Sequence, residues 1–356
     1  RVFASTDFLA ALYYAVVSRQ FSREHRAVLS GRIAYQQSLV ESGKSSALLR
    51  RNIHRLEKGL IMMPRREVFG EGFIRETVQS FSRAAARPEY SSEELKWAHD
   101  VLETYFEAVT PTPIIAAAKA SYAEAALRIR VPDPGRPLPQ RYVPYPQRCA
   151  PATSISYEEL LTLFQRRRSV RWYQNRPISK EDWLRIVHAG SSAPSACNRQ
   201  PFRFLIADSS DAAAEIAKCA GGTGGFADNL QALLVIVGDL SSYPTERDRH
   251  LIYIDASLAA MQMMLSAETL GLSTCPINWP DVEKAERNIA RLLPLSSYER
   301  VIMLMAVGYA EPSGGIPYSQ KKAPSELLDF LTRVPGRHPY RLTAVPEDLD
   351  GSRSEA

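Results

Sequence analysis

The stretch that decides the fold is DASLAAMQMMLSAETLGLSTCPIN, residues 255–278, where a long apolar helix passes through a glycine into a strand. We expect the helix over residues 249–270, ending at Gly271, because helices often end at glycine. The residues 273–277 then predict a strand. The helix is apolar on more sides than a surface helix needs, so it lies in the core, forms the contact between two copies, or does both.

Helices and strands alternate around this stretch, from about residue 154 to residue 330. Two helices begin at N-terminal caps: Ser156 with Glu159 forms a capping box, and Ser179 with Asp182 opens the next helix. Further strands are expected at 202–207, 233–237 and 301–307, and further helices from Asp211 and over 282–293. This order predicts an α+β fold in which helices cover a sheet.

Outside this region the composition changes. Residues 1–130 show apolar residues at three- and four-residue steps and predict a helical N-terminal domain. Seven prolines in residues 131–153 cannot be helical and predict a stiff Pro-rich linker. We therefore expect four parts: the helical domain at 1–130, the linker at 131–153, the mixed α+β domain at 154–330 and a C-terminal tail at 331–356.

Composition and charge exclude several classes of protein. The 356 residues are 45% hydrophobic and 23% charged, which is typical of a soluble protein with a real core. The net charge is +5, and residues 1–130 hold 19 Lys and Arg against 14 Asp and Glu. Because nucleic-acid binders carry a stronger basic bias, we expect no nucleic-acid partner.

Four cysteines show no spacing typical of a metal site. We expect no metal and four reduced thiols, as in a cytoplasmic protein. No apolar stretch approaches the roughly 20 residues that cross a bilayer. The early apolar run, residues 8–17, is expected to form a helix packed on its own domain; contact with a membrane surface is the alternative.

A basic run, RRRSVRWY, occupies residues 166–173. It places Arg167, Ser169 and Arg171 at alternate positions, so an extended segment would point all three to one side. Guanidinium and hydroxyl groups arranged in this way suit a phosphate or another anion. A solvated basic turn is the alternative.

A run of small residues, SSAPSACNRQP, occupies residues 191–201. Small side chains let a flat ligand approach the backbone, and Asn198, Arg199 and Gln200 then offer donors and acceptors to the edge of a heterocycle. Cys197 has no identifiable partner base, so we expect a structural residue there rather than a nucleophile.

Three further runs are less specific. Residues 221–225 are rich in glycine but lack the Lys and Ser or Thr of a P-loop, so they predict a flexible turn. In SQKKAP, residues 319–324, the two lysines either contact an anion or are merely exposed. In RNIHRLEKGL, residues 51–60, His54, Glu57 and Lys58 share a helix face. This face is either a lid that grips substrate or a salt-bridged surface patch.

Together these runs resemble the nitroreductase family of FMN enzymes. The resemblance spans residues 157–330 and rests on RRRSVRWY, on APSACNRQPFRF (193–204), on residues 255–278, and on MLMAVGYAEP (303–312) with the downstream SQKK. It implies a nitroreductase-like three-layer α/β/α fold with a central, mostly antiparallel sheet. The chain is similar to the longer members, which have a helical domain before this fold.

The resemblance also implies a cofactor site. Arg167 and Ser169 would hold the FMN phosphate, with Arg168 beside them and Arg171 toward the pyrimidine edge. Pro194, Ser195 and Ala196 would line the flavin ring, with Asn198 near the same edge and with Pro276, Ile277 and Asn278 over N5 and O4. Lys321 or Lys322 would complete the phosphate site, although Gln320 stands where the family often has a basic residue. No catalytic side chain is expected, because the chemistry takes place at flavin N5.

The function implied is that of an FMN-dependent oxidoreductase. NAD(P)H would reduce FMN, and an unidentified small-molecule acceptor would then take the electrons in a ping-pong cycle. The family is normally homodimeric, with FMN at the subunit interface. The alternatives are an oxidase or dehydrogenase that uses O2, and a flavin-binding accessory protein of polysaccharide biosynthesis with little turnover.

Overall fold

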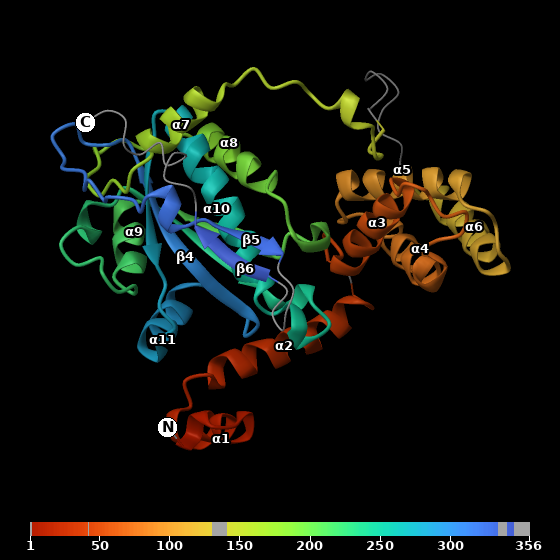
Figure 1. The fold of residues 1–356 in the computed structure, drawn as a ribbon, viewed down its shortest axis with the longest axis horizontal. Helices are drawn as coiled ribbons and strands as arrows, with labels where there is room; N and C mark the ends of the chain where they lie inside the picture. Colours follow the sequence, from red (N-terminus) through yellow and green to blue (C-terminus); the bar gives the residue numbers. More distant parts are fainter. Residues whose placement is uncertain (1, 42, 130–140, 334–339, 345–356) are drawn as a thin grey trace. The chain divides into compact units, whose positions relative to one another are not determined.

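The computed structural model describes residues 2–41, 43–129, 141–333 and 340–344 (Figure 1). The chain forms two compact units, residues 1–315 and 316–356. The predicted linker lies partly outside the described residues; its described part, 141–153, is irregular apart from one 3-10 turn.

A four-stranded antiparallel sheet lies at the centre of the first unit. Its strands are β1 (Phe202–Ala207), β2 (Ala232–Asp239), β3 (Ser273–Asn278) and β4 (Glu299–Gly308), in the spatial order β1-β2-β4-β3. The central strand β2 is apolar and buried almost throughout, because both faces of the sheet are covered. Strand β3 lies at an edge, where Pro276 is tolerated although it has no amide hydrogen to donate.

Helices cover both faces of this sheet. On one face, α8 (Lys180–Ser191) and α10 (Leu251–Thr269) share a core with alternate residues of β2 and β4. On the other face, α9 (Ser210–Ala217) and α11 (Glu283–Leu292) pack on the remaining residues of the same strands. The expected three-layer α/β/α arrangement is confirmed.

The helices before the sheet divide into two groups. Helices α3 (Ala47–Leu60), α4 (Glu71–Ala85), α5 (Ser92–Ala108) and α6 (Pro113–Ala126) surround a core of their own. Helix α2 (Ser22–Ser38) instead packs against the α8–α10 layer through Ala27 and Val28. The predicted helical region therefore contains one helix that completes the core of the sheet.

The early apolar segment differs from our expectation. It forms α1 (Asp7–Leu12) and a π-helical turn (Tyr13–Ser18), and neither buries a residue. Its aromatic side chains contact one another, as Phe3 with Tyr13, rather than a core. The predicted packing on its own domain is wrong, because ten apolar-rich residues yield only a short helix that reaches no buried surface. Among the described residues, no helix is long and apolar enough to cross a membrane.

The remaining elements are short. Helix α7 (Tyr157–Arg166) precedes the basic run. The 3-10 turns span Val2–Ala4, Gln147–Cys149, Ala196–Asn198, Ala227–Asn229, Leu240–Ser242, Glu246–Asp248 and Pro324–Glu326. In the second unit, β5 (Asp329–Arg333) and β6 (Tyr340–Ala344) pair as an antiparallel hairpin, where we expected only a tail. The rest of the predicted tail lies outside the described residues.

Candidate functional site

The basic run lies along the free edge of β3. The capping box of Ser156 and Glu159 fixes the start of α7, and the backbone becomes extended at Arg167, directly after the helix. The amide of Val170 donates to the carbonyl oxygen of Thr274 at 3.0 Å, next to a parallel bridge between Ser169 and Thr274. The sheet edge therefore holds the predicted anion-binding segment.

Three predicted side chains of this segment affect the thiol of Cys275 on β3. Burial raises the pKa of the Cys275 thiol, whereas Arg171, Arg167 and a hydrogen bond with Ser169 act in the opposite direction. Ser169 thus contacts the Cys275 thiol, and the positive charges of Arg167 and Arg171 act on the same group. Arg168 is half-buried between them in the sequence.

The guanidinium groups of Arg167 and Arg171 form no ion pair with any carboxylate of the described residues. Arg171 donates to the carbonyl oxygen of Ser169 at 3.3 Å and lies 5.7 Å from the centre of the Phe226 ring. Among the described residues, no carboxylate therefore lies within ion-pair distance of these two half-buried guanidinium groups at the β3 edge, which favours binding of an anion.

One buried carboxylate adjoins this cluster. Glu268, near the C-terminal end of α10, lies 3.4 Å from Nε of Arg166. Burial raises the pKa of Glu268, while Arg166 and Arg167 lower it. Its Oε1 atom and the buried hydroxyl of Thr274 have no hydrogen-bond partner among the described residues. The cluster thus contains polar atoms that a ligand could satisfy.

Strand β3 carries the next three predicted residues. Pro276 is half-buried, Ile277 packs in the core, and Asn278 is exposed at the end of the strand. They follow Cys275 on the same strand, whose preceding residue Thr274 pairs with Ser169 of the basic run.

The small-residue loop is held in an unusual backbone conformation. Residues Cys197, Asn198 and Gln200 have φ values of 54°, 52° and 49°, in the left-handed region that non-glycine residues rarely occupy. The amide of Ala196 donates to Asp255 Oδ2 at 2.9 Å, and the amide of Gln200 donates to Ser195 Oγ at 3.0 Å. The loop that includes Pro194 and Asn198 is therefore fixed against the start of α10.

The two groups of predicted residues lie at opposite ends of α10. The loop contacts this helix at Asp255, and the basic run contacts it at Glu268, 13 positions later. At 1.5 Å per residue these contacts are about 20 Å apart. One chain therefore brings the basic run together with β3 but does not bring the small-residue loop to them.

The other predicted runs have simpler outcomes. Lys321 and Lys322 are exposed in an irregular segment of the second unit, where the Gln320 side chain donates to the carbonyl oxygen of Lys321 at 3.1 Å. Residues 221–225 form a turn, as predicted. His54 lies 3.3 Å from Glu57, and Trp97 donates to Glu57 at 2.9 Å, which favours a polar patch for this part of α3.

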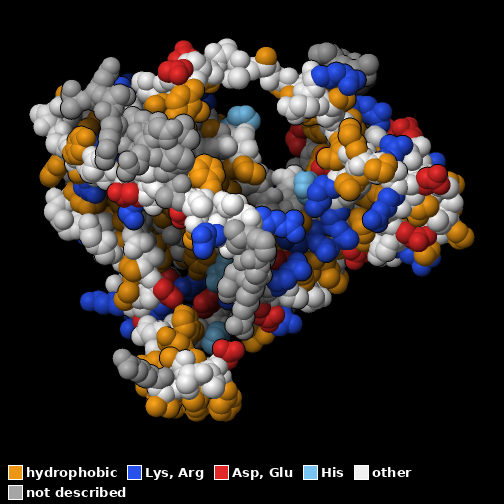
Figure 2. Space-filling view, viewed as in Figure 1, with side chains coloured by type: hydrophobic (Ala, Val, Ile, Leu, Met, Phe, Trp, Pro, Cys, Tyr) orange, Lys and Arg blue, Asp and Glu red, His pale blue; other side chains and the backbone are white. Residues whose placement is uncertain are grey.

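Sequence reasoning missed the residues that fix the loop. Arg50 of α3 and Asp255 of α10 both bind it, and Arg50 lies 148 positions from its partner Asn198. The buried Arg199 lies 5.0 Å from the Tyr243 ring centre, and its Nε has no partner among the described residues. No local pattern marks such long-range pairs. Figure 2 shows Lys and Arg side chains gathered where α3 meets the sheet-containing core.

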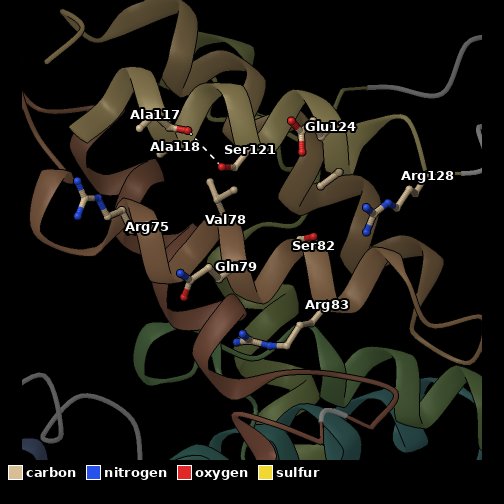
Figure 3. A pocket seen from close by; sticks show the side chains of 11 residues that line it. Arg75, Val78, Gln79, Ser82, Arg83, Ala117, Ala118, Ser121, Glu124 and Arg128 are labelled. Atoms are coloured by element: carbon tan, nitrogen blue, oxygen red, sulfur yellow. Dashed lines mark hydrogen bonds between the residues drawn. The ribbon is translucent and has the colours of Figure 1, made fainter. Parts of the chain in front are cut away.

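Two hollows among the described residues bear on the site. A small one of about 230 Å³ adjoins the loop and is lined by Ser45, Arg50, Ser191, Arg199, Gln200, Phe202 and Phe204. A larger one of about 420 Å³ lies between α4 and α6, with Arg75, Arg83 and Arg128 around its rim (Figure 3). None of the predicted site residues lines the larger hollow.

Comparison with known proteins shows what this chain is similar to. The sequence model of a family described as "Nitroreductase family" matches residues 164–224 and 220–309. A relative from Archaeoglobus fulgidus, whose name includes NADH dehydrogenase and NAD(P)H nitroreductase, is 30% identical over 154 residues, which are 43% of this chain and 86% of the relative. The FMN reductase [NAD(P)H] of Bacillus subtilis is 25% identical over 181 residues, covering 47% of this chain and 72% of the relative.

A solved structure, an FMN-dependent nitroreductase from Clostridium difficile, is 25% identical with a TM-score of 0.40, covering 45% of this chain and 92% of that one. The 30% identical relative and the family match show that the chain belongs to the nitroreductase family, and the predicted resemblance is confirmed. The family match begins at residue 164, in the last turn of α7, so it does not include helices α1 to α6.

Proposed function

We propose that this chain is an FMN-dependent oxidoreductase that takes a hydride from NAD(P)H and passes electrons to a small-molecule acceptor. The observation that carries the proposal is the pair of half-buried guanidinium groups, Arg167 and Arg171, at the β3 edge, neither of which forms an ion pair with a carboxylate of the described residues. Membership of the nitroreductase family, with an FMN reductase among the relatives, supports the same conclusion.

The residues at this edge fit the phosphate of FMN. A phosphate dianion needs positive charge and hydrogen-bond donors, and Arg167 with the Ser169 hydroxyl offers both. Arg168 adjoins them in the sequence. Arg171 would face the pyrimidine edge, where a guanidinium stabilises negative charge.

The flavin ring would lie between the small-residue loop and the end of β3. Pro194, Ser195 and Ala196 would line it without crowding, with Asn198 toward its polar edge. Pro276, Ile277 and Asn278 would cover the opposite part of the ring. When bound, FMN supplies hydride transfer at N5 in a ping-pong cycle, and the chain supplies binding, orientation and charge.

We further propose that two copies build each site. One face of α10 exposes Ile254 by 53% and Leu258 by 43%, with Met261 one turn further along. Helix α7, which adjoins α10, buries no residue and exposes Tyr157 and Phe164. A contiguous apolar helical face of this kind is typical of a subunit contact.

A two-fold contact between two copies, in which the α10 helices lie antiparallel, would bring the small-residue loop and the basic run together. A two-fold axis across the middle of this helix places the Asp255 end of one copy beside the Glu268 end of the other. The loop of one copy, with Asn198, would then meet the basic run of the other, with Arg167. We therefore propose a homodimer with two flavin sites, in the cytoplasm, where the four free cysteines would stay reduced.

The test is a flavin titration followed by reduction. The apoprotein is titrated with FMN, and the complex is then treated with NADPH or NADH without oxygen. The proposal predicts saturable binding with one FMN per chain and bleaching of the flavin absorbance. A chain that binds no FMN would overturn it. If FMN binds but neither NADPH nor NADH reduces it, the result would instead favour one of the two alternative functions, an O2-dependent enzyme or a flavin-binding accessory protein.

A further inference from the structure

A single arginine connects the helical domain to the small-residue loop. Arg50, on α3, donates from Nε to the carbonyl oxygen of Asn198 at 2.7 Å and from Nη2 to Oε1 of Gln200 at 2.9 Å. Its third nitrogen, Nη1, donates to Oε2 of Glu94 at 3.0 Å. All three nitrogens of the guanidinium are therefore engaged, two of them with the loop.

The helical domain also orients this guanidinium, through a buried carboxylate. Glu94, on α5, has a side chain only 3% exposed. It accepts hydrogen bonds from the hydroxyls of Ser45 and Tyr90 and from the amide of Ser46. Because this carboxylate is fixed by several donors, it fixes the arginine in turn, and a charged hydrogen bond in a buried setting is directional.

The loop needs such support. Asn198 and Gln200, the two residues that Arg50 contacts, both have a left-handed backbone, as does Cys197 between Ala196 and Asn198. Non-glycine residues hold this conformation only where the surroundings over-determine it. The Gln200 side chain, oriented by Arg50, also donates from Nε2 to the carbonyl oxygen of Ser191 at 2.6 Å. The arginine therefore fixes both the backbone and the side-chain bonds of the strained segment.

We propose that Arg50 is a positioning residue that sets the conformation of the loop at residues 195–200 against the flavin ring. This inference rests on the proposed function, because that function places the ring on the loop. It gives the helical domain a role in the reaction without contact with the flavin phosphate. In the proposed dimer, the helical domain of one copy would control the flavin bound by the basic run of the other.

The test compares the holoprotein with Arg50→Lys. A lysine keeps a positive charge beside Glu94, but one ammonium group cannot reproduce the fork that reaches Asn198 and Gln200 together. A second variant, Gln200→Met, removes the loop-side amide and leaves the pair of Arg50 and Glu94 intact. The control is Arg83→Ala, an arginine of α4 that has no polar partner among the described residues.

Three quantities are measured, and one of them, the hydrogen exchange of the loop amides, does not depend on flavin. Hydrogen exchange reports the amides of Ala196, Asn198 and Gln200, which are all hydrogen-bonded within or near the loop. We expect Arg50→Lys to speed their exchange about tenfold or more, with the amides of β2 unchanged. We expect the FMN dissociation constant to rise about tenfold, within the range for loss of a charged hydrogen bond, and the flavin midpoint potential to shift.

The outcomes separate the two proposals. If wild-type protein binds no FMN, the proposed function fails. Faster loop exchange in Arg50→Lys would still show that Arg50 holds the loop at residues 195–200. If wild-type protein binds FMN and both loop variants keep wild-type exchange, affinity and potential, the inference fails alone. If exchange quickens and the flavin properties stay unchanged, Arg50 is merely structural and the positioning role is refuted. Arg83→Ala should match wild type throughout.

Discussion

The carboxylate of Asp255 accepts a hydrogen bond from the backbone amide of Ala196 at 2.9 Å, which fastens the small-residue loop to the first turns of α10. Burial raises the pKa of Asp255, while this hydrogen bond and Arg199 lower it. The same helix meets Arg166 at its other end, through Glu268. Helix α10 therefore acts as a spacer of about 20 Å between the two halves of the candidate site.

Removing the phosphate contacts should weaken FMN binding strongly. Charged hydrogen bonds contribute about 1.5–3 kcal/mol each, so Arg167→Ala with Ser169→Ala should raise the FMN dissociation constant by about 100-fold or more. Fluorescence titration of the apoprotein measures it. Arg287→Ala, at an exposed arginine of α11, is the control and should bind FMN normally. Wild-type affinity in the double variant would show that the phosphate lies elsewhere.

A charge on the apolar face of α10 should separate the subunits. Leu258→Glu places a carboxylate where we propose contact with a second copy, and a buried unpaired charge is costly. Sedimentation velocity should show a monomer with weakened FMN binding. The matched control is Leu184→Glu on α8, where the leucine is 71% exposed. The account of the dimer fails if Leu258→Glu stays dimeric or if the wild-type protein is a monomer.

The pH dependence of stability should show the burial of Glu268. Its pKa is raised by folding, so its protonated form contributes stability at low pH, and that contribution is lost as the pH rises through the folded-state pKa. Glu268→Gln cannot ionise. The free energy of unfolding of this variant, relative to wild type, should therefore increase from pH 4 to pH 8. Urea unfolding at several pH values measures it, and a difference that is flat or falls with pH would contradict the assignment.

Close packing of α2 on the sheet-containing core can be tested at a glycine. A Cβ at Gly31 would lie 2.7 Å from Cβ of Leu240 and 2.8 Å from its carbonyl oxygen. Gly31→Ala should therefore lower the free energy of unfolding by about 1–3 kcal/mol. Gly72→Ala, in the first turn of α4, has open space around its Cβ and should be neutral or stabilising. Equal effects in the two variants would mean that α2 is not docked as described.

Local patterns predicted the sheet domain well. The run at residues 255–278, with its glycine stop, predicted α10 and β3, and the capping box at Ser156 predicted α7. These features depend on neighbours in the sequence, so they can be recognised there. The predicted opening of α9 at Asp211 is off by one residue, because Ser209 caps the helix and Ser210 begins it.

The contacts that organise the site depend on distant residues and could not be predicted in this way. The partners of the loop, Arg50 and Asp255, are ordinary members of helices in the sequence. The separation of Arg167 from Asn198 became apparent only from the way α10 lies between them. The predicted roles of Arg167, Asn198 and the other cofactor residues remain predictions until flavin binding is measured.

The central claim is that each flavin site combines the basic run of one copy with the loop of the other. Mixing subunits tests it directly. Arg167→Ala with Ser169→Ala inactivates one half of the site, and Ala196→Glu, which sets a carboxylate against the proposed ring position, blocks the other half. Each variant alone should bind little FMN. In a hybrid dimer of the two, one site has both halves intact and the other has neither.

The measurement is FMN bound per chain after equal amounts of the two variants are unfolded and refolded together. Random pairing makes half of the dimers hybrids, so the account predicts recovery of FMN binding to about one quarter of the wild-type level. Refolding each variant separately should give no recovery. A mixture that binds no more FMN than the separate variants, with hybrids shown to form, would contradict the shared site and place both halves within one chain.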